Sequence, residues 1–371
     1  MSVRDLIIIG GGPSGLAAAI AARKHGLDYQ VLEQGVLVNS IYRFPPQMVF
    51  FTTPELLEIG GLPFVSPNDK PTRAEALKYY RKVVDSFDLQ IAFDERVTSV
   101  MRNQAEGAFE VETGSSRGVR RVRLARSVIF AIGYYDHPVA LGIVGEDLPH
   151  VSHYFSDPHV HYRQRVVVVG GGNSAAEAAL LLYRSGAHVT MVHRRASLKR
   201  TIKYWVRPDI ENRIKEGSIA ARFSSRVTEI RPGSIVVQSI RGDASADDEA
   251  TRQRELFADA DASRAPAAAV TSTPTAGGLE EIPAEAVYLL TGYRADSELL
   301  CRVGVRLNDR EAPVHDPQTF ETNVPGIFIA GGAIAGVDTG TIFIENGRFH
   351  GEKIVQTIAQ RIADSGLRIS D

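Results

Sequence analysis

The stretch Leu6-Ile7-Ile8-Ile9-Gly10-Gly11-Gly12-Pro13-Ser14-Gly15 decides the fold of this chain. An apolar run that leads into spaced glycines and then into an alanine-rich segment predicts a buried strand, a tight turn and a helix. Gly10 permits the turn, Gly12 lets the backbone approach a pyrophosphate, and Gly15 lets the helix pack closely on the strand. The N–H groups at the start of such a helix favour an anion. Residues 10–15, the first glycine turn, therefore predict a dinucleotide site.

Glu33 is the acidic residue that accompanies such a turn. It directly follows a second apolar strand at 29–32. A carboxylate at the end of this strand accepts hydrogen bonds from a ribose diol and would repel a 2′-phosphate. The first nucleotide is therefore expected to be FAD or NAD rather than NADP.

The same pattern returns in the second half of the chain. The apolar run 165–169 leads into residues 170–175, the second glycine turn, in which Gly170, Gly172 and Ala175 take the three roles. The strand that follows, 188–192, ends in His193-Arg194-Arg195 where the first copy has an acid. Guanidinium groups bind phosphate in a bidentate manner, so this turn predicts NADPH, with a basic surface loop as the alternative.

Length and composition narrow the class of protein. The 371 residues suffice for two domains with separate cores. A formal net charge of -2 gives no indication of nucleic acid or an acidic membrane as partner, and no run approaches the roughly 18 apolar residues of a membrane span. The first strand begins too early for a signal peptide, so a cytoplasmic protein is expected. The single cysteine, Cys301, excludes an internal disulfide and is expected to be a small core residue.

The segments that follow each of the two turns predict an α/β protein with two Rossmann-like domains. Alternating patterns predict a small antiparallel meander at 91–101, 109–113 and 119–124. Buried strands are expected at 127–133, 286–290 and 324–332, and residues 341–348 lead into a helix that ends near 362. We therefore expect an FAD domain formed by 1–155 and 286–371, and an NADPH domain at 156–285.

The remaining segments are less regular. The paired prolines of 38–46 predict a loop, and Thr72 is expected to cap a helix that runs to about 85. The segment 145–164 contains four histidines, His150, His153, His159 and His161, but no accompanying cysteine, so a linker is favoured over a metal site. Residues 242–278 are rich in Ala, Asp, Ser and Thr and predict a mobile insertion attached to a meander at 222–240.

With these motifs together, the chain resembles the flavoproteins of the thioredoxin reductase type and, more closely, the bacillithiol disulfide reductase (YpdA) family. The resemblance covers nearly the whole chain except 242–278. It is carried by Gly10-Gly11-Gly12-Pro13-x-Gly15, Val38-Asn39-Ser40-Ile41-Tyr42, Lys70-Pro71, Gly133-Tyr134-Tyr135-Asp136 and Thr341-Ile342-Phe343-Ile344-Glu345-Asn346-Gly347. It implies FAD in the first domain, NADPH in the second, reduction of a low-molecular-weight thiol disulfide, and a homodimer or homotetramer.

The motifs and the resemblance together define the residues expected at each cofactor. Glu177 is expected to orient the nicotinamide carboxamide, and no metal ligand is expected. The residues expected to contact FAD are Gly10, Gly12, Pro13, Ser14, Gly15, Glu33, Gln34, Ser40, Tyr42, Val97, Ala131, Gly133, Gly331 and Ile342. Those expected to contact NADPH are Gly170, Gly172, Asn173, Ser174, Ala175, Glu177, His193, Arg194, Arg195 and Gly292.

Two positions depart from the pattern of the families that the chain resembles. Ser14 stands where members proposed to act on bacillithiol disulfide carry a cysteine, and a hydroxyl cannot attack a disulfide as a thiolate does. Gly332 stands where thioredoxin reductases usually place an Asp on the ribityl chain. No catalytic residue is therefore assigned from the sequence.

Two other functions fit parts of the sequence. Residues 148–155 and 172–175 resemble the linker and nucleotide turn of flavin-containing monooxygenases. Alternatively, the chain is a flavoprotein that passes electrons to a protein partner such as a ferredoxin or a thioredoxin-like protein. Oxygen-dependent hydroxylation would favour the first of these, and activity that requires a protein acceptor would favour the second.

Overall fold

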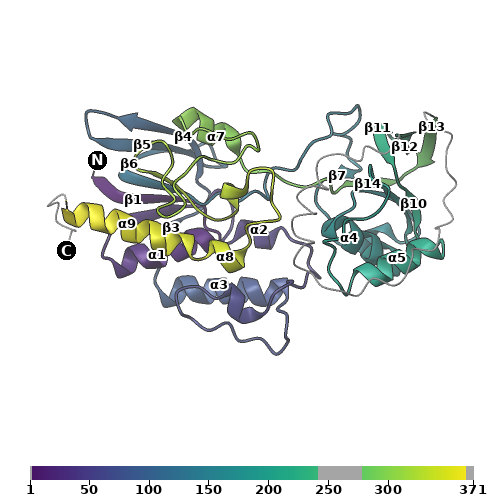
Figure 1. Cartoon of the computed structure of the whole chain (residues 1–371), viewed down its shortest axis with the longest axis horizontal. Coiled ribbons are helices and arrows are strands. Elements are labelled where there is room, and N and C mark those ends of the chain that lie inside the picture. Colours follow the sequence, from purple (N-terminus) through teal and green to yellow (C-terminus); the bar gives the residue numbers. More distant parts are fainter. Residues whose placement is uncertain (1, 241–277, 365–371) are drawn as a thin grey trace. The chain divides into compact units, whose positions relative to one another are not determined.

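The structure is a computed structural model that describes residues 2–240 and 278–364 (Figure 1). The chain divides into two compact units, residues 1–139 with 292–371, and residues 140–291. The sequence placed the second domain at 156–285 instead. The second unit is therefore longer at both ends. Residues 140–155 belong to it because the short strand β7 (Val151–Ser152) pairs in parallel with β14 (Ala286–Leu289). Residues 286–291, expected in the first domain, belong to it because β14 also pairs with the strand at 165–169.

The first unit is built on a mixed sheet in the order β3-β2-β1-β6-β5-β4, with β15 also paired to β6. Its parallel strands are β1 (Val3–Ile9), β2 (Tyr29–Leu32), β3 (Ile91–Ala92), β6 (Arg120–Phe130) and β15 (Ile327–Ile329). The antiparallel strands are β4 (Arg96–Asn103) and β5 (Ala108–Gly114).

The meander expected from the sequence is wrong in one respect, which concerns strand β6. Two strands were expected, at 119–124 and 127–133, but they form one. Leu124 pairs with Glu110 of β5 on one side and with Val3 of β1 on the other, so the ladder continues from the meander into the central sheet without a turn.

Helices cover the sheet of the first unit. The alanine-rich helix α1 (Pro13–Lys24) is buried from Gly15 to Ala22 and packs against α9 (His350–Asp364), so closely that a Cβ on Gly351 would lie 2.5 Å from the backbone nitrogen of Ala18. Helix α3 (Arg73–Ser86) begins at the predicted cap, where Thr72 and Glu75 form a capping box. The shorter helices are α2 (Asn39–Tyr42), η1 (Pro54–Leu57), α7 (Ser297–Val303), η3 (Gly331–Ala335) and α8 (Ile344–Gly347).

The second unit has a parallel sheet in the order β10-β9-β8-β14-β7 and a separate antiparallel sheet in the order β11-β12-β13. The parallel sheet contains β8 (Arg165–Val169), β9 (His188–Val192) and β10 (Ala220–Arg222), accompanied by η2 (Pro158–His161), α4 (Asn173–Arg184) and α5 (Arg207–Lys215). The antiparallel sheet contains β11 (Ser225–Arg231), β12 (Ser234–Ser239) and β13 (Leu279–Pro283). The predicted insertion at 242–278 lies outside the described residues apart from Gly278.

Two smaller expectations are wrong. The segment 38–46 is not all loop, because Asn39 to Tyr42 complete one helical turn before Pro45 and Pro46 end it. Cys301 is exposed rather than in the core, because α7 turns its leucines, Leu299 and Leu300, toward the buried cluster instead.

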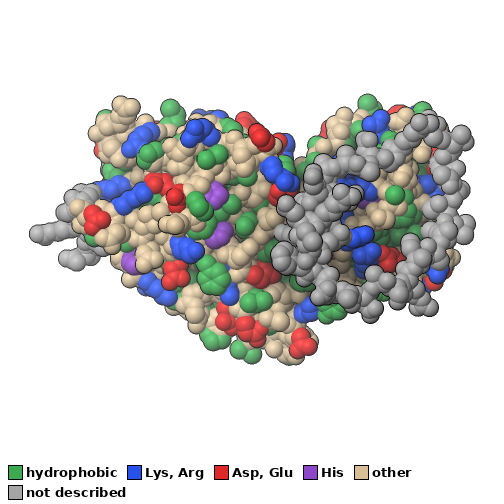
Figure 2. All heavy atoms as spheres, in the orientation of Figure 1, with side chains coloured by type: hydrophobic (Ala, Val, Ile, Leu, Met, Phe, Trp, Pro, Cys, Tyr) green, Lys and Arg blue, Asp and Glu red, His purple; other side chains and the backbone are tan. Residues whose placement is uncertain are grey.

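Each unit repeats a strand, a glycine turn and a helix beside further parallel strands, so both units have the Rossmann-like α/β architecture that the sequence predicts. On the face of the first unit visible in Figure 2, charged side chains of both signs are interspersed with apolar ones. Within the described residues, no helix is long and apolar enough to cross a membrane.

Candidate functional site

The first glycine turn connects β1 to α1 and leaves space on one side. Gly10 has a φ of 111°, and a Cβ there would lie 2.9 Å from the carbonyl carbon of Ala131. A Cβ on Gly15 would overlap the carbonyl oxygen of Gly10. A Cβ on Gly12, in contrast, would meet no atom of the described residues within 4 Å. The turn is thus tightly packed on its protein side and open at Gly12, which fits the approach of a pyrophosphate to the start of α1.

Glu33, directly after β2, lies against this turn. It is 5% exposed, and its carboxylate accepts the N–H groups of Gly11 at 2.7 Å and Gly35 at 2.8 Å. Burial raises the pKa of Glu33, while the hydrogen bonds from the two glycines oppose this rise. A carboxylate has about four acceptor sites, so the two backbone bonds leave capacity for the hydroxyls of a ribose.

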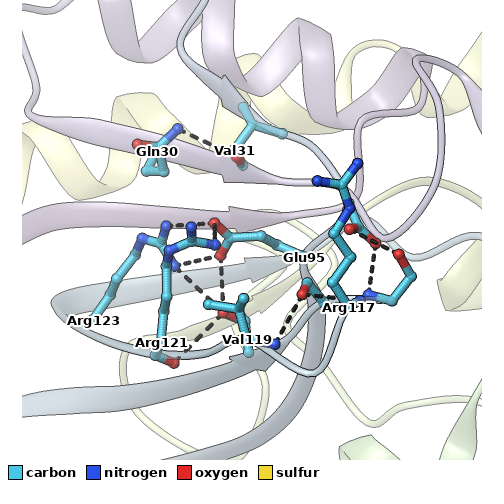
Figure 3. Close-up of polar contacts among 11 residues, drawn as sticks. Gln30, Val31, Glu95, Arg117, Val119, Arg121 and Arg123 are labelled. Carbon is cyan, nitrogen blue, oxygen red and sulfur yellow. Dashed lines mark hydrogen bonds and ion pairs between the residues drawn. The ribbon is translucent and has the colours of Figure 1, made fainter.

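The backbone of Glu33 is held by the end of β3 and by a residue that follows it. Its N–H donates to Ala92, and its carbonyl accepts the N–H of Glu95. The Glu95 carboxylate, 4% exposed, lies between the guanidinium groups of Arg121 and Arg123 on β6, at 3.1 and 2.8 Å (Figure 3). This ion cluster around a buried carboxylate joins the meander to the loop that carries Glu33.

The carboxyl ends of β1, β6 and β15 meet beside the same turn. A Cβ on Gly331, after β15, would overlap the hydroxyl of Ser14, and one on Gly347 would lie 3.2 Å from that hydroxyl. His350 accepts the N–H of Gly331 through Nδ1 at 3.2 Å, so its proton is on Nε2. His350 is missing from the residues predicted from the sequence, and no local pattern marks it.

Asp136 organises the loop after Glu33. It accepts hydrogen bonds from Gln34 at 2.9 Å, Asn39 at 3.4 Å and Arg43 at 3.1 Å. Gln34 is therefore engaged with protein through its amide nitrogen. Asp136 belongs to the motif at 133–136 and is missing from the residues predicted to contact a cofactor.

The other predicted FAD residues are spread around this region. Pro13 and Ser14 form the first turn of α1, and Ser40 is half-buried in α2. Tyr42 is 53% exposed beneath the Arg73 guanidinium. Ala131 is buried beside Gly10, and Ile342 lies near Gly347. A Cβ on Gly133 would meet nothing within 4 Å in the part of the chain that the structure describes. Val97 belongs to a buried cluster with Ile9 and Leu32.

The second glycine turn has the same construction. A Cβ on Gly170, whose φ is 150°, would lie 2.5 Å from the carbonyl oxygen of Leu290. Among residues 2–240 and 278–364, a Cβ on Gly172 would have only the Lys199 stem, at 3.8 Å, as a neighbour within 4 Å. Ala175 is buried behind the turn, and Ser174 is exposed. This turn also fits a pyrophosphate at the start of its helix, α4.

His193 covers the second turn as Glu33 covers the first. A Cβ on Gly171 would lie 2.5 Å from the Cε1 atom of His193. The ring is 7% exposed, and its Nε2 has no hydrogen-bond partner among the described residues. Burial, followed by the charges of Arg195, Lys199 and Arg194, lowers the pKa of His193 to about 4. The imidazole is therefore neutral at pH 7 and has a nitrogen available to a ligand.

A basic segment after β9 folds onto the second turn. The N–H of Lys199 donates to Gly171, and Asn173 accepts the N–H of Lys203 at 2.8 Å and donates to Thr201 at 3.2 Å. The buried Lys203 ammonium pairs with Glu177 at 2.8 Å, so the carboxylate expected to orient nicotinamide is bound by a lysine.

Three features of the second site were not expected from the sequence. Lys199 and Lys203 were missed, although they lie in the same basic stretch as Arg194 and Arg195. Gly292, expected at NADPH, belongs to the first unit, where its carbonyl accepts the N–H of Val139.

The histidine-rich segment 145–164 packs within the second unit. His161 is hydrogen-bonded to the hydroxyl of Tyr288 at 2.7 Å and to Gln164 at 2.8 Å. Over residues 2–240 and 278–364, no three His, Cys, Asp or Glu side chains gather in a way that could hold a metal ion.

Comparison with known proteins identifies the family. Residues 7–252 match the pyridine nucleotide-disulphide oxidoreductase family. The chain is 38% identical to the bacilliredoxin reductase Bdr of Bacillus subtilis (strain 168) over 96% of this chain and 97% of that protein. The bacillithiol disulfide reductase Bdr (YpdA) from Bacillus cereus has 37% sequence identity and superposes with a TM-score of 0.84 over 97% of this chain and all of that one.

A more distant structure supports the fold. The thioredoxin reductase of Lactococcus lactis superposes with a TM-score of 0.69 at 20% identity, over 97% of this chain and 99% of that one. The chain therefore belongs to the bacillithiol disulfide reductase (YpdA) family of pyridine nucleotide-disulphide oxidoreductases, which are flavoprotein disulfide reductases, and its cofactors are FAD and NADPH.

Proposed function

We propose that the first unit binds FAD, that the second binds NADPH, and that the enzyme reduces a low-molecular-weight thiol disulfide, with bacillithiol disulfide as the candidate substrate. One contrast carries the assignment of the two units. Two turns of the same construction are covered by a carboxylate, Glu33, in one unit and by a neutral imidazole, His193, followed by Arg194 and Arg195 in the other.

The charges explain why each turn takes its own nucleotide. In the first unit, the Glu33 carboxylate accepts hydroxyls of the FAD ribose, and Gly10, Gly12 and Gly15 admit the pyrophosphate. In the second, Arg194 and Arg195 bind the 2′-phosphate of NADPH, while the unpartnered Nε2 of His193 is available to the same ribose. FAD, when bound, accepts a hydride from NADPH and supplies the electron pair that a disulfide consumes.

The balanced reaction is NADPH plus a proton plus a disulfide giving NADP⁺ and a pair of thiols. This chain supplies no thiol at the first turn, because Ser14 occupies that place. The sulfur atoms that react are therefore those of the substrate itself or of a protein partner. The name of the Bacillus subtilis relative, bacilliredoxin reductase, supports a second candidate acceptor, which is a small thioredoxin-like protein with its own cysteines.

The test is the rate of NADPH oxidation by the purified, FAD-loaded full chain without oxygen, with and without bacillithiol disulfide. We expect NADPH oxidation to accelerate and to release a pair of thiols for each NADPH. Reduction of the flavin without any effect of the disulfide would refute the small-molecule function. Parallel samples with a thioredoxin-like disulfide protein or with oxygen would then separate the protein-carrier and monooxygenase alternatives.

We further infer a cytoplasmic enzyme that forms a homodimer or homotetramer. The likeness to the YpdA family supports this inference. Light scattering coupled to gel filtration measures the mass of the assembly, and a mass equal to the 40.4 kDa chain would contradict it.

A further inference from the structure

Tyr134 and Gly332 lie together at the carboxyl edge of the first sheet. Tyr134 is the fourth residue after β6, Gly332 is the third after β15, and the two strands are parallel neighbours in which Phe130 pairs with Ile329. A Cβ on Gly332 would lie 2.6 Å from Cδ1 of the Tyr134 ring and 2.8 Å from Cε1. The ring therefore occupies the space in which any side chain at position 332 would begin.

The hydroxyl of Tyr134 has no hydrogen-bond partner among the residues that the structure describes. The ring itself is partly buried and packs against the apolar cluster beneath the sheet edge. Desolvation, followed by the negative charge of Glu345, raises the pKa of the phenol, so the hydroxyl keeps its proton at pH 7. The hydroxyl is not among the fully buried side-chain atoms that lack a partner, so it is accessible and available to a ligand.

The order of the strands shows which part of the ligand lies there. Glu33 marks the end of β2, and the first glycine turn marks the end of β1. The ribose next to adenine is therefore assigned to the end of β2, and the pyrophosphate to the end of β1. Strand β6 is the next strand in this order. The ends of β6 and β15 are next along this edge, beyond the pyrophosphate, where the flavin half of FAD continues.

We propose that Tyr134 is a flavin-positioning residue whose hydroxyl donates a hydrogen bond to the flavin half of FAD, and that position 332 is glycine so that the Tyr134 ring can lie there. This inference rests on the proposed binding of FAD to the first unit. It gives a physical reason for the departure at Gly332, because an Asp at this position would clash with the ring.

The first test compares Tyr134→Phe with Tyr80→Phe. Tyr80 is fully buried in the same unit, and its hydroxyl donates to the carbonyl of Leu57 at 3.0 Å. Tyr134→Phe removes a hydroxyl that has no partner within the described chain, so we expect an unchanged or higher melting temperature of the apoprotein and a Kd for FAD raised about 3- to 10-fold. Tyr80→Phe should lower the melting temperature and leave the Kd for FAD and the flavin absorption spectrum unchanged.

The second test asks whether a glycine is needed at position 332 to leave space for the Tyr134 ring. Gly332→Ala should weaken FAD binding in the natural chain by displacing the ring, and the same substitution should have a much smaller effect in a Tyr134→Ala background. Fluorescence titration of the apoprotein with FAD measures both. The proposal is overturned if Tyr134→Phe leaves the FAD affinity and spectrum unchanged, or if Gly332→Ala weakens binding equally in the two backgrounds.

A Gly12→Val variant separates this proposal from the function on which it rests. A valine side chain would fill the open side of the first glycine turn. If Gly12→Val abolishes FAD binding while Tyr134→Phe does not change it, only the role of Tyr134 is refuted. If Gly12→Val still binds FAD with the natural affinity, the assignment of FAD to the first unit fails as well.

Discussion

Glu33 and His193 occupy the same position in the two units. Each is the first residue after the second strand of its glycine-turn motif, β2 or β9, and each covers the middle glycine of the turn. Glu33 accepts the N–H of Gly11 at 2.7 Å, whereas the His193 ring lies against Gly171. One backbone arrangement thus presents a carboxylate in the first unit and a neutral imidazole, flanked by cations, in the second.

This equivalence predicts the effect of exchanging the charge. In a His193→Glu variant, a carboxylate would repel the 2′-phosphate and compete for Arg194 and Arg195. We expect kcat/KM for NADPH to fall by about 10- to 100-fold, which corresponds to the loss of one or two charge-assisted hydrogen bonds, while kcat/KM for NADH changes much less. Anaerobic flavin reduction with each nucleotide measures both values.

The matched control is His188→Glu. His188 is exposed at the opposite end of the same strand, β9, so this variant adds the same charge away from the second turn. Its selectivity should remain that of the natural enzyme. An equal loss of NADPH activity in both variants, or unchanged selectivity in His193→Glu, would show that the turn does not select the nucleotide through this position.

Glu33→Gln should lower both the stability of the apoprotein and its affinity for FAD. A glutamine has one side-chain oxygen for the two N–H groups, of Gly11 and Gly35, that the carboxylate now accepts. Because a buried donor is left unsatisfied, we expect a loss of about 1 to 3 kcal/mol in the free energy of unfolding and weaker FAD binding. Denaturant unfolding and FAD titration measure these effects. Glu112→Gln, at an exposed position on β5, is the control, and equal behaviour of the two variants would contradict the prediction.

The two strand, turn and helix motifs could be predicted from the sequence because each obeys local rules. Gly10 and Gly170 have positive φ angles in their turns, which favour glycine, and Thr72 caps α3 through a residue three positions away. The α/β fold class and the family follow from these motifs and are confirmed by the comparisons. The residues assigned to each nucleotide remain predictions.

Features that depend on distant pairing could not be predicted in the same way. The continuity of β6 depends on simultaneous pairing with β1 and β5, and the place of residues 140–155 depends on a two-residue strand that pairs with β14. The contacts of Asp136, Lys203 and His350 likewise join residues far apart in the chain or on different elements. Helix α7 is too short for its periodicity to show that Cys301 is exposed.

Two buried histidines should make stability fall in mild acid. Burial, as the leading cause, lowers the pKa of both His193 and His350 from 6.5 to about 4. Unfolded histidines take up protons near pH 6.5, whereas the folded ones do so only near pH 4. The contribution of these histidines to the free energy of unfolding is therefore complete above pH 6.5. It decreases as the pH falls from 6.5 to 4, by about 3 kcal/mol for each histidine. Denaturant unfolding of the apoprotein across this range measures the slope.

His350→Asn tests the contribution of one of these residues. The asparagine oxygen can accept the Gly331 N–H that Nδ1 of His350 now accepts, but it does not titrate. The pH dependence of stability should therefore become shallower. His25→Asn, at an exposed position after α1, should leave the slope unchanged. A natural protein whose stability is constant between pH 6.5 and 4 would contradict the prediction.

Ser14→Cys should create a reactive thiol at the first turn. Ser14 is the second residue of α1, and its hydroxyl lies beside Gly331 and Gly347. The start of a helix lowers the pKa of a thiol by about one unit or more, which raises its thiolate fraction near pH 7 about tenfold over a free cysteine. We expect the introduced thiol to be alkylated faster than that of Cys301 and to increase the turnover of small disulfides. Alkylation rates across pH, with Ser14→Ala as the control, provide the measurement. If disulfide turnover is unchanged while the new thiol is reactive, the reduction of disulfides does not pass through this position.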